Sequence, residues 1–202
     1  FEEDYSGQSL QGSYLGGVYY PDKTRVGWWK NGYPEYFAKV LNSVNWIGIR
    51  FEINGEILDL AKAKVLDFHR ELNMQEGVLY RNFKVELSSG LSFKAEVSRF
   101  ISMQRKEIGA IQYSFQVEGG DAEVKVTPYL DFDVVNHDSN YDEKFWEGIS
   151  QTADETSSQV KARTRKLDFE VSAATQFKLL ENGTAFSANS ESSSRDKYAE
   201  SC

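Results

Sequence analysis

The sequence is poor in the residues that bind metals or cross-link strands. Its 202 residues include one cysteine, Cys202 at the last position, and two histidines, His69 and His137. A single cysteine excludes an intramolecular disulfide framework and provides no thiol pair for zinc. The histidines stand in no metal-ligand spacing such as H-E-x-x-H, so we expect no metal and no other cofactor. This cysteine usage is compatible with a reducing compartment, and we expect a cytoplasmic protein.

Long apolar runs and an excess of positive charge are also missing. No apolar run approaches the roughly 18 to 20 residues that a membrane helix needs, and no signal-peptide h-region opens the chain. The 23 Lys and Arg residues are outnumbered by 31 Asp and Glu, which gives a net charge of −8 and a sequence pI near 4.9. Such a field repels phosphate backbones and anionic lipid. We therefore expect neither nucleic acid nor a membrane as a partner.

Motifs of autonomous catalysis are absent as well. There is no Gly-rich phosphate loop and no G-x-S-x-G elbow. Carboxylates are plentiful, but sequence alone does not place two of them across a sugar, as glycoside hydrolysis requires. Glu147 beside Trp146 superficially resembles an acid next to a sugar-stacking ring, and a charged loop residue beside an anchoring aromatic explains the pair better. We interpret the basic cluster Lys161, Arg163, Arg165 and Lys166 as the solvated face of a strand.

What the sequence does contain is the pattern of antiparallel sheet. Aromatic residues make up 14% of the chain, and runs such as 111–117 alternate apolar and polar residues, which is typical of strands with one buried face. Asn54-Gly55 and Asn182-Gly183 each separate two such runs and predict hairpins with type I′ turns. Residues 60–77 have an ambiguous period, and we favour a strand there. A tight turn at 119–121 is expected to pair the run before it with the run after it.

These patterns predict one all-β domain, an antiparallel β-sandwich. We expect core strands over 46–135 and further strands over 155–188. Residues 136–154 are too polar for a strand and should form an acidic loop. Residues 189–202 have the composition of a polar tail or linker. The chain has no initiator methionine, and we expect it to be a piece truncated at both ends.

The first 46 residues are expected to be an aromatic, loop-rich segment. Pro21, Pro34, Gly27 and Gly32 prevent one uninterrupted helix or strand over 16–46. The same stretch contains a dense group of aromatic residues, Tyr19, Tyr20, Trp28, Trp29, Tyr33, Tyr36, Phe37 and Trp46. Aromatic side chains offer a large apolar area at low entropic cost. The segment therefore either plugs the end of the core or faces a partner or ligand.

Several stretches together resemble the N-terminal β-sandwich region of glycoside hydrolase family 65, and within it the maltose phosphorylases. The stretches are FEEDYSGQSLQGSYLGGVYYPDKTRVGWWKNGYPEYFAKVLN, NWIGIRFEINGEILDL, VLDFHRELNMQEGVLYRNFKVEL, RFISMQRKEIGAIQYSF and TPYLDFDVVNHDSNYDEKFW. The resemblance is strong over residues 1–147 and weaker beyond them. It implies that the sandwich is of the super-sandwich type and that the parent enzyme has this N-terminal sandwich, a helical (α/α)6 catalytic barrel and a small C-terminal β-domain.

The resemblance also implies a reaction and a role. The parent would phosphorolyse an α-glucosyl disaccharide such as maltose, with inorganic phosphate as co-substrate, to β-glucose 1-phosphate and glucose. Its general acid, a Glu of the barrel, has no counterpart here, so this chain is expected to be inactive alone and to have no catalytic residue. It would support the barrel and a homodimer of the full enzyme. The expected barrel or substrate-rim contacts are Phe1, Glu2, Glu3, Asp4, Trp28, Trp29, Tyr33 and Tyr36.

A second hypothesis keeps the sandwich and changes its role. The chain would be an autonomous carbohydrate-binding module, with Trp28, Trp29 and Tyr33 as a platform on which sugar rings stack. If the aromatics exceed what this chain can bury alone, part of the segment should be exposed to solvent or to a partner. Burial of Trp28, Trp29, Tyr33 and Tyr36 within one chain would count against that expectation.

Overall fold

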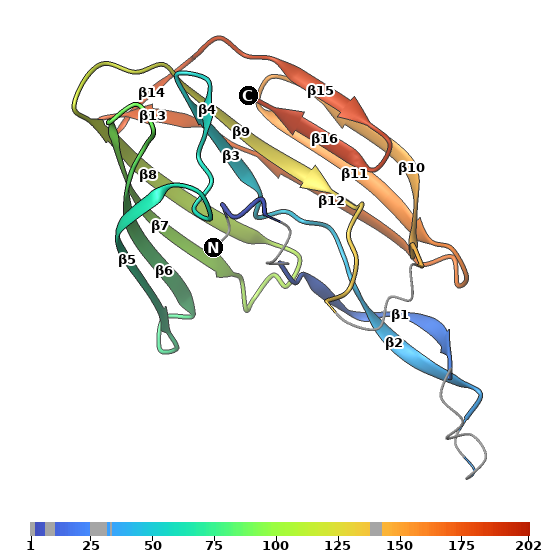
Figure 1. Cartoon of the computed structure of the whole chain (residues 1–202). Coiled ribbons are helices and arrows are strands. Elements are labelled where there is room, and N and C mark those ends of the chain that lie inside the picture. Colours follow the sequence, from blue (N-terminus) through green and yellow to red (C-terminus); the bar gives the residue numbers. More distant parts are fainter. Residues whose placement is uncertain (1–2, 7–10, 25–31, 33, 138–142) are drawn as a thin grey trace. The chain divides into compact units, whose positions relative to one another are not determined.

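The computed structural model describes residues 3–6, 11–24, 32, 34–137 and 143–202. Within these ranges every regular element is a β-strand and all strand pairs are antiparallel, as the alternating pattern predicts (Figure 1). No helix in this part of the chain is long and apolar enough to cross a membrane. The chain divides into two compact units. Unit 1 comprises Phe1–Ser9 and Arg50–Val126, and unit 2 comprises Leu10–Ile49 and Thr127–Cys202.

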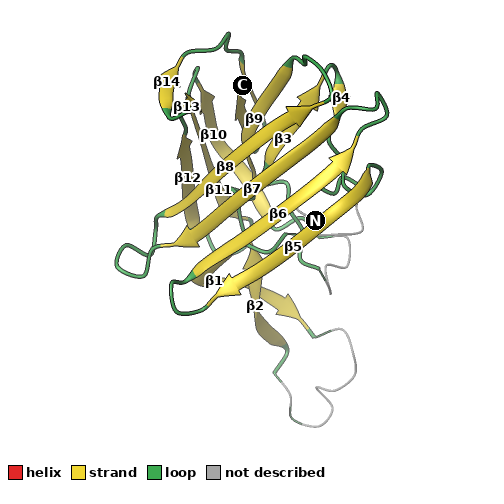
Figure 2. Cartoon of the chain, turned by 90° about the vertical axis from the view of Figure 1, so that its left-hand side faces the viewer, coloured by secondary structure: helices red, strands yellow, loops and turns green. Residues whose placement is uncertain are grey.

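Unit 1 is built around one four-stranded sheet. Its strands follow one another as hairpins in the order β5-β6-β7-β8 (Figure 2). Asn54 and Gly55 have φ of 50° and 80° in the turn before β4, which confirms the predicted type I′ hairpin. The ambiguous stretch 60–77 does contain a strand. The elements of the unit are β3 (Ile49–Ile53, from Arg50), β4 (Glu56–Ile57), β5 (Lys64–Asn73), β6 (Val78–Glu86), β7 (Ser92–Ile101), β8 (Gly109–Glu118) and the first residues of β9 (Val124–Asp131).

An aromatic cluster fills the core of unit 1. Phe51 of β3 is 1% exposed, and its ring centroid lies 5.4 Å from Phe93, 4.5 Å from Tyr113 and 5.3 Å from Phe115. Phe93 also stacks on Phe83. Two layers, β3 and the β5–β8 sheet, therefore bury their facing side chains against each other, as in a sandwich.

Unit 2 contains two three-stranded arrangements and two hairpins. The order β10-β11-β12 forms one sheet, and β15-β16-β9 is the part of a five-stranded sheet that belongs to unit 2. β10 and β11 pack against β15 and β16. The elements are β1 (Tyr14–Lys23), β2 (Tyr36–Asn42), β10 (Trp146–Ala153), β11 (Ser157–Thr164), β12 (Glu170–Gln176), β13 (Leu179–Glu181), β14 (Thr184–Phe186), β15 (Ser192–Arg195) and β16 (Tyr198–Ser201).

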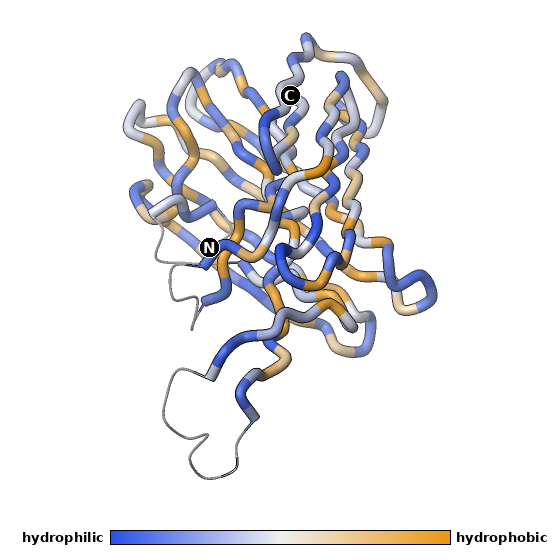
Figure 3. The backbone as a smooth tube through the Cα atoms, turned by 90° about the vertical axis from the view of Figure 1, so that its right-hand side faces the viewer, coloured by the Kyte–Doolittle hydropathy of each residue, from blue (hydrophilic) through white to orange (hydrophobic). Residues whose placement is uncertain are grey.

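The core of unit 2 gathers residues from distant parts of the chain. Trp146 is 2% exposed, packs on Phe132 with ring centroids 5.1 Å apart, and donates its indole N–H to the carbonyl of Asn42 at 2.8 Å. Hydrophobic and hydrophilic residues interleave along the strands (Figure 3). The buried members are Tyr20, Leu41, Val44, Leu130, Phe132, Val134, Phe145, Trp146, Val160, Ala162 and Ala199.

Three segments expected to be irregular contain strands. β1 and β2 lie in the expected loop-rich segment 1–46, β10 in the expected acidic loop, and β15 and β16 in the expected tail. In β1, Pro21 is tolerated because a two-stranded ribbon leaves one N–H side of each strand without a partner strand. β10 buries only Trp146, and β16 buries Tyr198, Ala199 and Ser201. Both segments are otherwise polar, so a hydrophobic pattern does not predict these strands.

The expected pairing across the 119–121 turn is wrong. β8 pairs with β7, whereas β9 pairs with β16 and leads away from β8. Within unit 1, Asn54 N–H donates to the carbonyl of Glu123 at 2.9 Å. The chain therefore crosses from one layer to the other at Gly119, whose φ is 101°. A glycine at a turn allows the chain to change direction there, but it does not determine which strand the following strand pairs with.

Candidate functional site

The ribbon formed by β1 and β2 is the described part of the aromatic segment that was expected to contact a partner. Its register places Tyr20 opposite Lys39 and Tyr19 opposite Val40. The pairing is interrupted between Tyr14 and Tyr19, where Gly17 adopts a φ of 83° that suits glycine. Side chains opposite each other share a face, so the ribbon has two distinct faces.

The inner face of the ribbon fixes it to unit 2. Tyr20 and Leu41 are 1% and 0% exposed, and the Tyr20 ring meets Phe145 edge-on with centroids 4.9 Å apart. The Nζ atom of Lys39 forms an ion pair with Asp22 at 2.6 Å. Lys39 Nζ also lies 5.3 Å from the centre of the Phe145 ring, close enough for a cation–π contact.

A cluster of polar side chains also holds the ribbon to unit 2. The Tyr20 hydroxyl donates to Glu143 at 2.7 Å, and the Lys166 ammonium pairs with the same carboxylate at 2.8 Å. Burial, and then the bond to Glu143, raise the pKa of Tyr20 above its usual value. The Glu143 carboxylate raises the pKa of Lys166. Tyr20 thus stays protonated and Lys166 charged at neutral pH, which suits an anchor.

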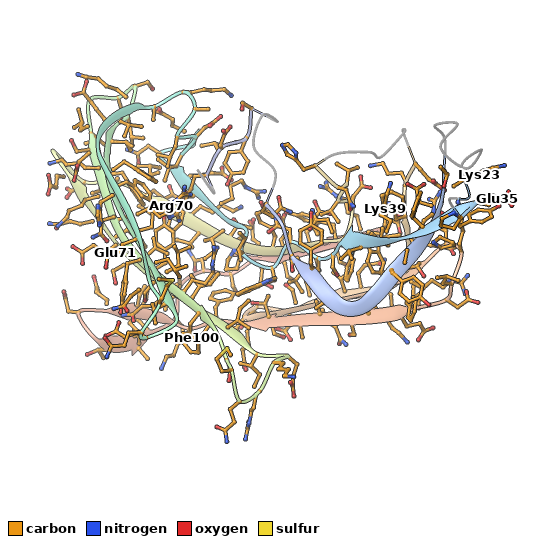
Figure 4. All side chains as sticks on the ribbon, turned by 90° about the horizontal axis from the view of Figure 1, so that it is seen from below. Lys23, Glu35, Lys39, Arg70, Glu71 and Phe100 are labelled. Carbon is orange, nitrogen blue, oxygen red and sulfur yellow. The ribbon has the colours of Figure 1, made fainter. Side chains whose placement is uncertain are left out.

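The outer face of the ribbon is apolar and exposed. Tyr19, Tyr36 and Val40 are 42%, 51% and 54% exposed, and by register they share this face with Pro21 and Ala38. Tyr19 has a ring neighbour in unit 2, Phe169, at a centroid distance of 5.2 Å. Figure 4 shows Lys23, Glu35 and Lys39 at this part of the molecule, and Lys23 and Glu35 form an exposed ion pair at 3.6 Å. An exposed apolar face with charged margins is a surface suited to contact another protein part.

The predicted contact residues fall into three groups. Tyr36 lies on the outer face of the ribbon in unit 2, and Glu3 and Asp4 belong to unit 1. Asp4 is half-buried and accepts a bond from the backbone N–H of Ser6 at 2.9 Å. The remaining five, Phe1, Glu2, Trp28, Trp29 and Tyr33, lie outside the described residues.

Glu3 occupies an interior position within unit 1. Its carboxylate forms a bidentate pair with Arg81, with Nη2–Oε1 at 2.7 Å and a second, shorter contact from Nη1 to Oε2. The Tyr113 hydroxyl donates to the same carboxylate at 3.2 Å, and Leu60 N–H donates to the Glu3 carbonyl at 2.8 Å. A charge-assisted fork of this kind fixes direction as well as position, so the chain enters the unit at a defined place.

Glu147, considered above beside Trp146, and the acidic residues Asp131 and Asp133 all have structural partners. Glu147 accepts from Arg163 at 3.0 Å. Burial raises the pKa of Asp131, whereas Asp133 bonds the Lys197 ammonium at 3.0 Å, which lowers its pKa. Of the histidines, His69 contacts Glu71 at 3.5 Å, and His137 is exposed. In the described ranges no group of three or more His, Cys, Asp or Glu could hold a metal ion.

Sequence reasoning missed the anchor of the ribbon. The sequence does alternate over 18–22 and over 37–41, which is a signal for two strands. In the structure the register of these strands pairs Tyr20 with Lys39 and Asp22 with Phe37. Two prolines and several glycines in the same stretch obscured it. The partner Glu143 is 123 positions from Tyr20, and no local pattern predicts such a contact.

Comparison with known proteins gives consistent results. Residues 1–201 match the family model described as glycosyl hydrolase family 65, N-terminal domain. The chain is 42% identical over 200 residues to a maltose phosphorylase of Bacillus subtilis (strain 168), covering 99% of this chain and 26% of that protein. It is 29% identical over 149 residues to an alpha,alpha-trehalose phosphorylase of Thermoanaerobacter brockii, covering 70% of this chain and 19% of that protein.

A solved structure agrees with these matches. A putative kojibiose phosphorylase from the human microbiome superposes with a TM-score of 0.81 at 25% identity, over 99% of this chain and 25% of that one. The chain thus spans about a quarter of the length of the relatives that it matches.

Proposed function

The chain belongs to glycosyl hydrolase family 65 as its N-terminal domain, and from this premise we propose that it is the non-catalytic N-terminal part of a disaccharide phosphorylase. The observation that carries the proposal is the match of the family model to residues 1–201, taken with relatives four times as long. Those relatives phosphorolyse maltose, trehalose or kojibiose by name. The 42% identity favours a maltose-like substrate.

The proposed reaction takes place outside these 202 residues. Inorganic phosphate attacks the anomeric carbon of an α-glucoside, a general acid of the helical barrel protonates the leaving oxygen, and inversion gives β-glucose 1-phosphate and glucose. Phosphate replaces the second carboxylate that an inverting hydrolase uses to activate water. The structural partners of Glu147 and Asp133 fit this division of labour. We place the enzyme in the cytoplasm.

The role of this chain would be mechanical support. The outer face of the ribbon, with Tyr19, Tyr36 and Val40, offers the apolar surface that a barrel or a sister subunit of a homodimer would cover. Trp28, Trp29 and Tyr33 belong to the same stretch of sequence, between β1 and β2. Together with Phe1, Glu2 and Asp4 they remain our candidates for contacts at the substrate rim, whereas the interior position of Glu3 removes it from this set.

Activity measurements on the 202-residue chain and on the full-length protein test the proposal. Circular dichroism first establishes that the chain alone is folded as β-structure. Phosphate-dependent release of glucose from maltose is expected from the full-length protein and not from the chain alone. Release by the chain would place catalytic residues within it and refute the proposal.

A second candidate function is autonomous carbohydrate binding, favoured by the exposure of Tyr36 and Phe37 at 51% and 45%. Exposed aromatic rings stack on sugars as well as on protein surfaces. Isothermal titration of maltose into the chain is expected to give no heat if its role is support. Millimolar or tighter binding that disappears in Trp28→Ala and Trp29→Ala would establish the binding module instead.

A further inference from the structure

Two Asn-Gly pairs form the same turn in different surroundings. Asn54-Gly55 joins β3 to β4 in unit 1, and Asn182-Gly183 joins β13 to β14 in unit 2. Both asparagines have a φ of 50°, and the two glycines have φ of 80° and 83°. A third pair, Asn31-Gly32, has its asparagine outside the described residues. The two described turns therefore present the same reactive pair on a matched backbone.

An asparagine followed by glycine is open to attack on its side-chain amide by the next backbone nitrogen. This nitrogen bonds to Cγ, the Cγ–Nδ2 bond breaks, and ammonia leaves with the proton that the backbone nitrogen gives up. Water then opens the succinimide ring at either carbonyl carbon, which leaves an aspartate or an isoaspartate. Glycine favours the attack because it has no Cβ, and at Gly55 and Gly183 no described atom lies within 4 Å of the place that a Cβ would occupy.

Asn54 is held at both its backbone and its side chain. Its N–H donates to the carbonyl of Glu123 at 2.9 Å, and its Oδ1 accepts the N–H of Glu123 at 2.9 Å. The strand before it is anchored in the core, since Phe51 and Ile53 are each 1% exposed. Rotation of the Asn54 side chain toward the nitrogen of Gly55 therefore breaks a hydrogen bond, and opening of the turn displaces buried side chains.

Asn182 lacks both restraints. Its side chain is exposed and makes no hydrogen bond with any other residue that the structure describes. Its hairpin is a separate two-stranded sheet (Figure 2). The strands pair Leu179 with Phe186, Leu180 with Ala185 and Glu181 with Thr184. All of these side chains except that of Leu179 are exposed. A short hairpin with little buried apolar surface opens at a low cost in free energy, so its backbone can reach the geometry of ring closure.

We propose that Asn182 is a site of spontaneous deamidation in the folded protein, and that the two hydrogen bonds to Glu123 protect Asn54 from the same reaction. The inference is independent of the proposed function. The reaction needs only water and the base of a mildly alkaline buffer, because no group is oxidised or reduced and ammonia is the only product that leaves.

Deamidation changes the hairpin in two ways. In an isoaspartate the main chain runs through Cβ and Cγ, which adds one methylene, so a two-residue type I′ turn no longer fits and the pairing of Glu181 with Thr184 is lost. Either product also adds a negative charge to a chain whose net charge is −8, next to the carboxylate of Glu181. Modified molecules therefore differ from new ones in charge and in the turn between β13 and β14.

Peptide mass spectrometry of the full-length protein tests the proposal. The folded protein is incubated at mildly alkaline pH in water enriched in heavy oxygen, which labels only the carboxyl groups formed during the incubation. We expect Asn182 to deamidate about tenfold faster than Asn54 or more, because the local opening of its turn costs less. Electron-transfer fragmentation separates isoaspartate from aspartate, and we expect both products at Asn182.

The same protein in concentrated urea shows whether the difference in rate belongs to the fold. Both turns are lost there, and we expect Asn54 and Asn182 to deamidate at similar rates. A difference that persists in urea would assign the effect to the neighbouring residues in sequence and overturn the proposal. Equal rates in the folded protein, or no reaction at Asn182, would overturn it too.

Glu123→Pro tests the protection of Asn54. Proline lacks the N–H that Asn54 Oδ1 accepts, so deamidation of Asn54 should become several-fold faster. Glu123→Ala keeps this N–H and is the matched control, with both rates unchanged. An unchanged rate at Asn54 in the folded proline variant would refute the protective role of Glu123. If circular dichroism shows that this variant does not fold, the comparison of folded and urea-treated parent protein decides, since it requires no substitution.

Discussion

Arg81→Met is expected to destabilise unit 1 more than any exposed ion-pair variant in this chain. The side chains of Arg81 and Glu3 are each 3% exposed, and Glu3 has a further bond from the Tyr113 hydroxyl at 3.2 Å. Removal of the guanidinium leaves a carboxylate in the interior without its countercharge. Breaking a buried pair in this way costs about 3–5 kcal/mol of the free energy of unfolding.

Thermal and urea denaturation followed by circular dichroism measure this loss. For a protein of this size each kcal/mol lowers Tm by about 2–4 °C, so the variant should melt roughly 6–20 °C below the parent. Lys64→Met is the matched control, because Lys64 pairs with Glu86 across neighbouring strands at 3.2 Å with exposures of 68% and 42%. Exposed pairs contribute at most about 1 kcal/mol.

A double variant separates the pair from its surroundings. Glu3→Leu combined with Arg81→Met replaces two charges with apolar groups, and we expect it to recover much of the stability that either single change loses. If Arg81→Met loses no more than Lys64→Met, burial of the pair is refuted. If the double variant loses the sum of the two single effects, the two side chains do not interact.

Three further predictions concern unit 2. Trp146→Phe removes the donor to the buried Asn42 carbonyl and should lower the free energy of unfolding by about 1–3 kcal/mol in urea; an unchanged midpoint would contradict the bond. Gly183→Ala should lower it by about 1–2 kcal/mol, because Gly183 has a φ of 83° in the hairpin between β13 and β14; an equally stable variant would exclude that conformation. Asp133→Asn tests a pH dependence: Lys197 holds the pKa of Asp133 below its ordinary 3.8, so its stabilising contribution is full at neutral pH and is lost as the pH falls through the lowered pKa. Thermal melts should show the variant less stable than the parent at neutral pH, with the two converging in acid, and parallel curves would refute the linkage.

The fold was predictable wherever burial on one face leaves an alternating sequence. β7, with Phe93, Ala95 and Val97 buried, shows this pattern. The Asn54-Gly55 turn predicts the hairpin of β3 and β4 without ambiguity. Such signals are local because a side chain and its neighbour two positions away meet the same core. The alternating runs predicted the sandwich, and the resemblance to the family, strong over residues 1–147, implied the same fold.

The missed elements depend on partners that are distant in sequence. β15 is fully exposed along Ser192–Arg195 and owes its conformation to β16, which in turn pairs with β9 some 67 positions earlier, as in Tyr198 with Asp131. Of the candidate site, the exposure of Tyr36 was expected, whereas the interior position of Glu3 follows from Arg81, which is 78 positions away. No pattern among residues close in sequence predicts the β16–β9 pairing or the contact between Glu3 and Arg81.

The division of the chain into units also sets an order of events during synthesis. In unit 1, β5 to β8 pair with sequence neighbours, so this sheet has low contact order and can form soon after it leaves the ribosome. Unit 2 is split, with Leu10–Ile49 made first and Thr127–Cys202 last. At translation rates of 5–20 residues per second, Tyr20 precedes its ring partner Phe145 by roughly 6–25 s. The aromatic ribbon is therefore the part of the nascent chain that waits longest for its core, and the part that chaperones would have the most time to bind.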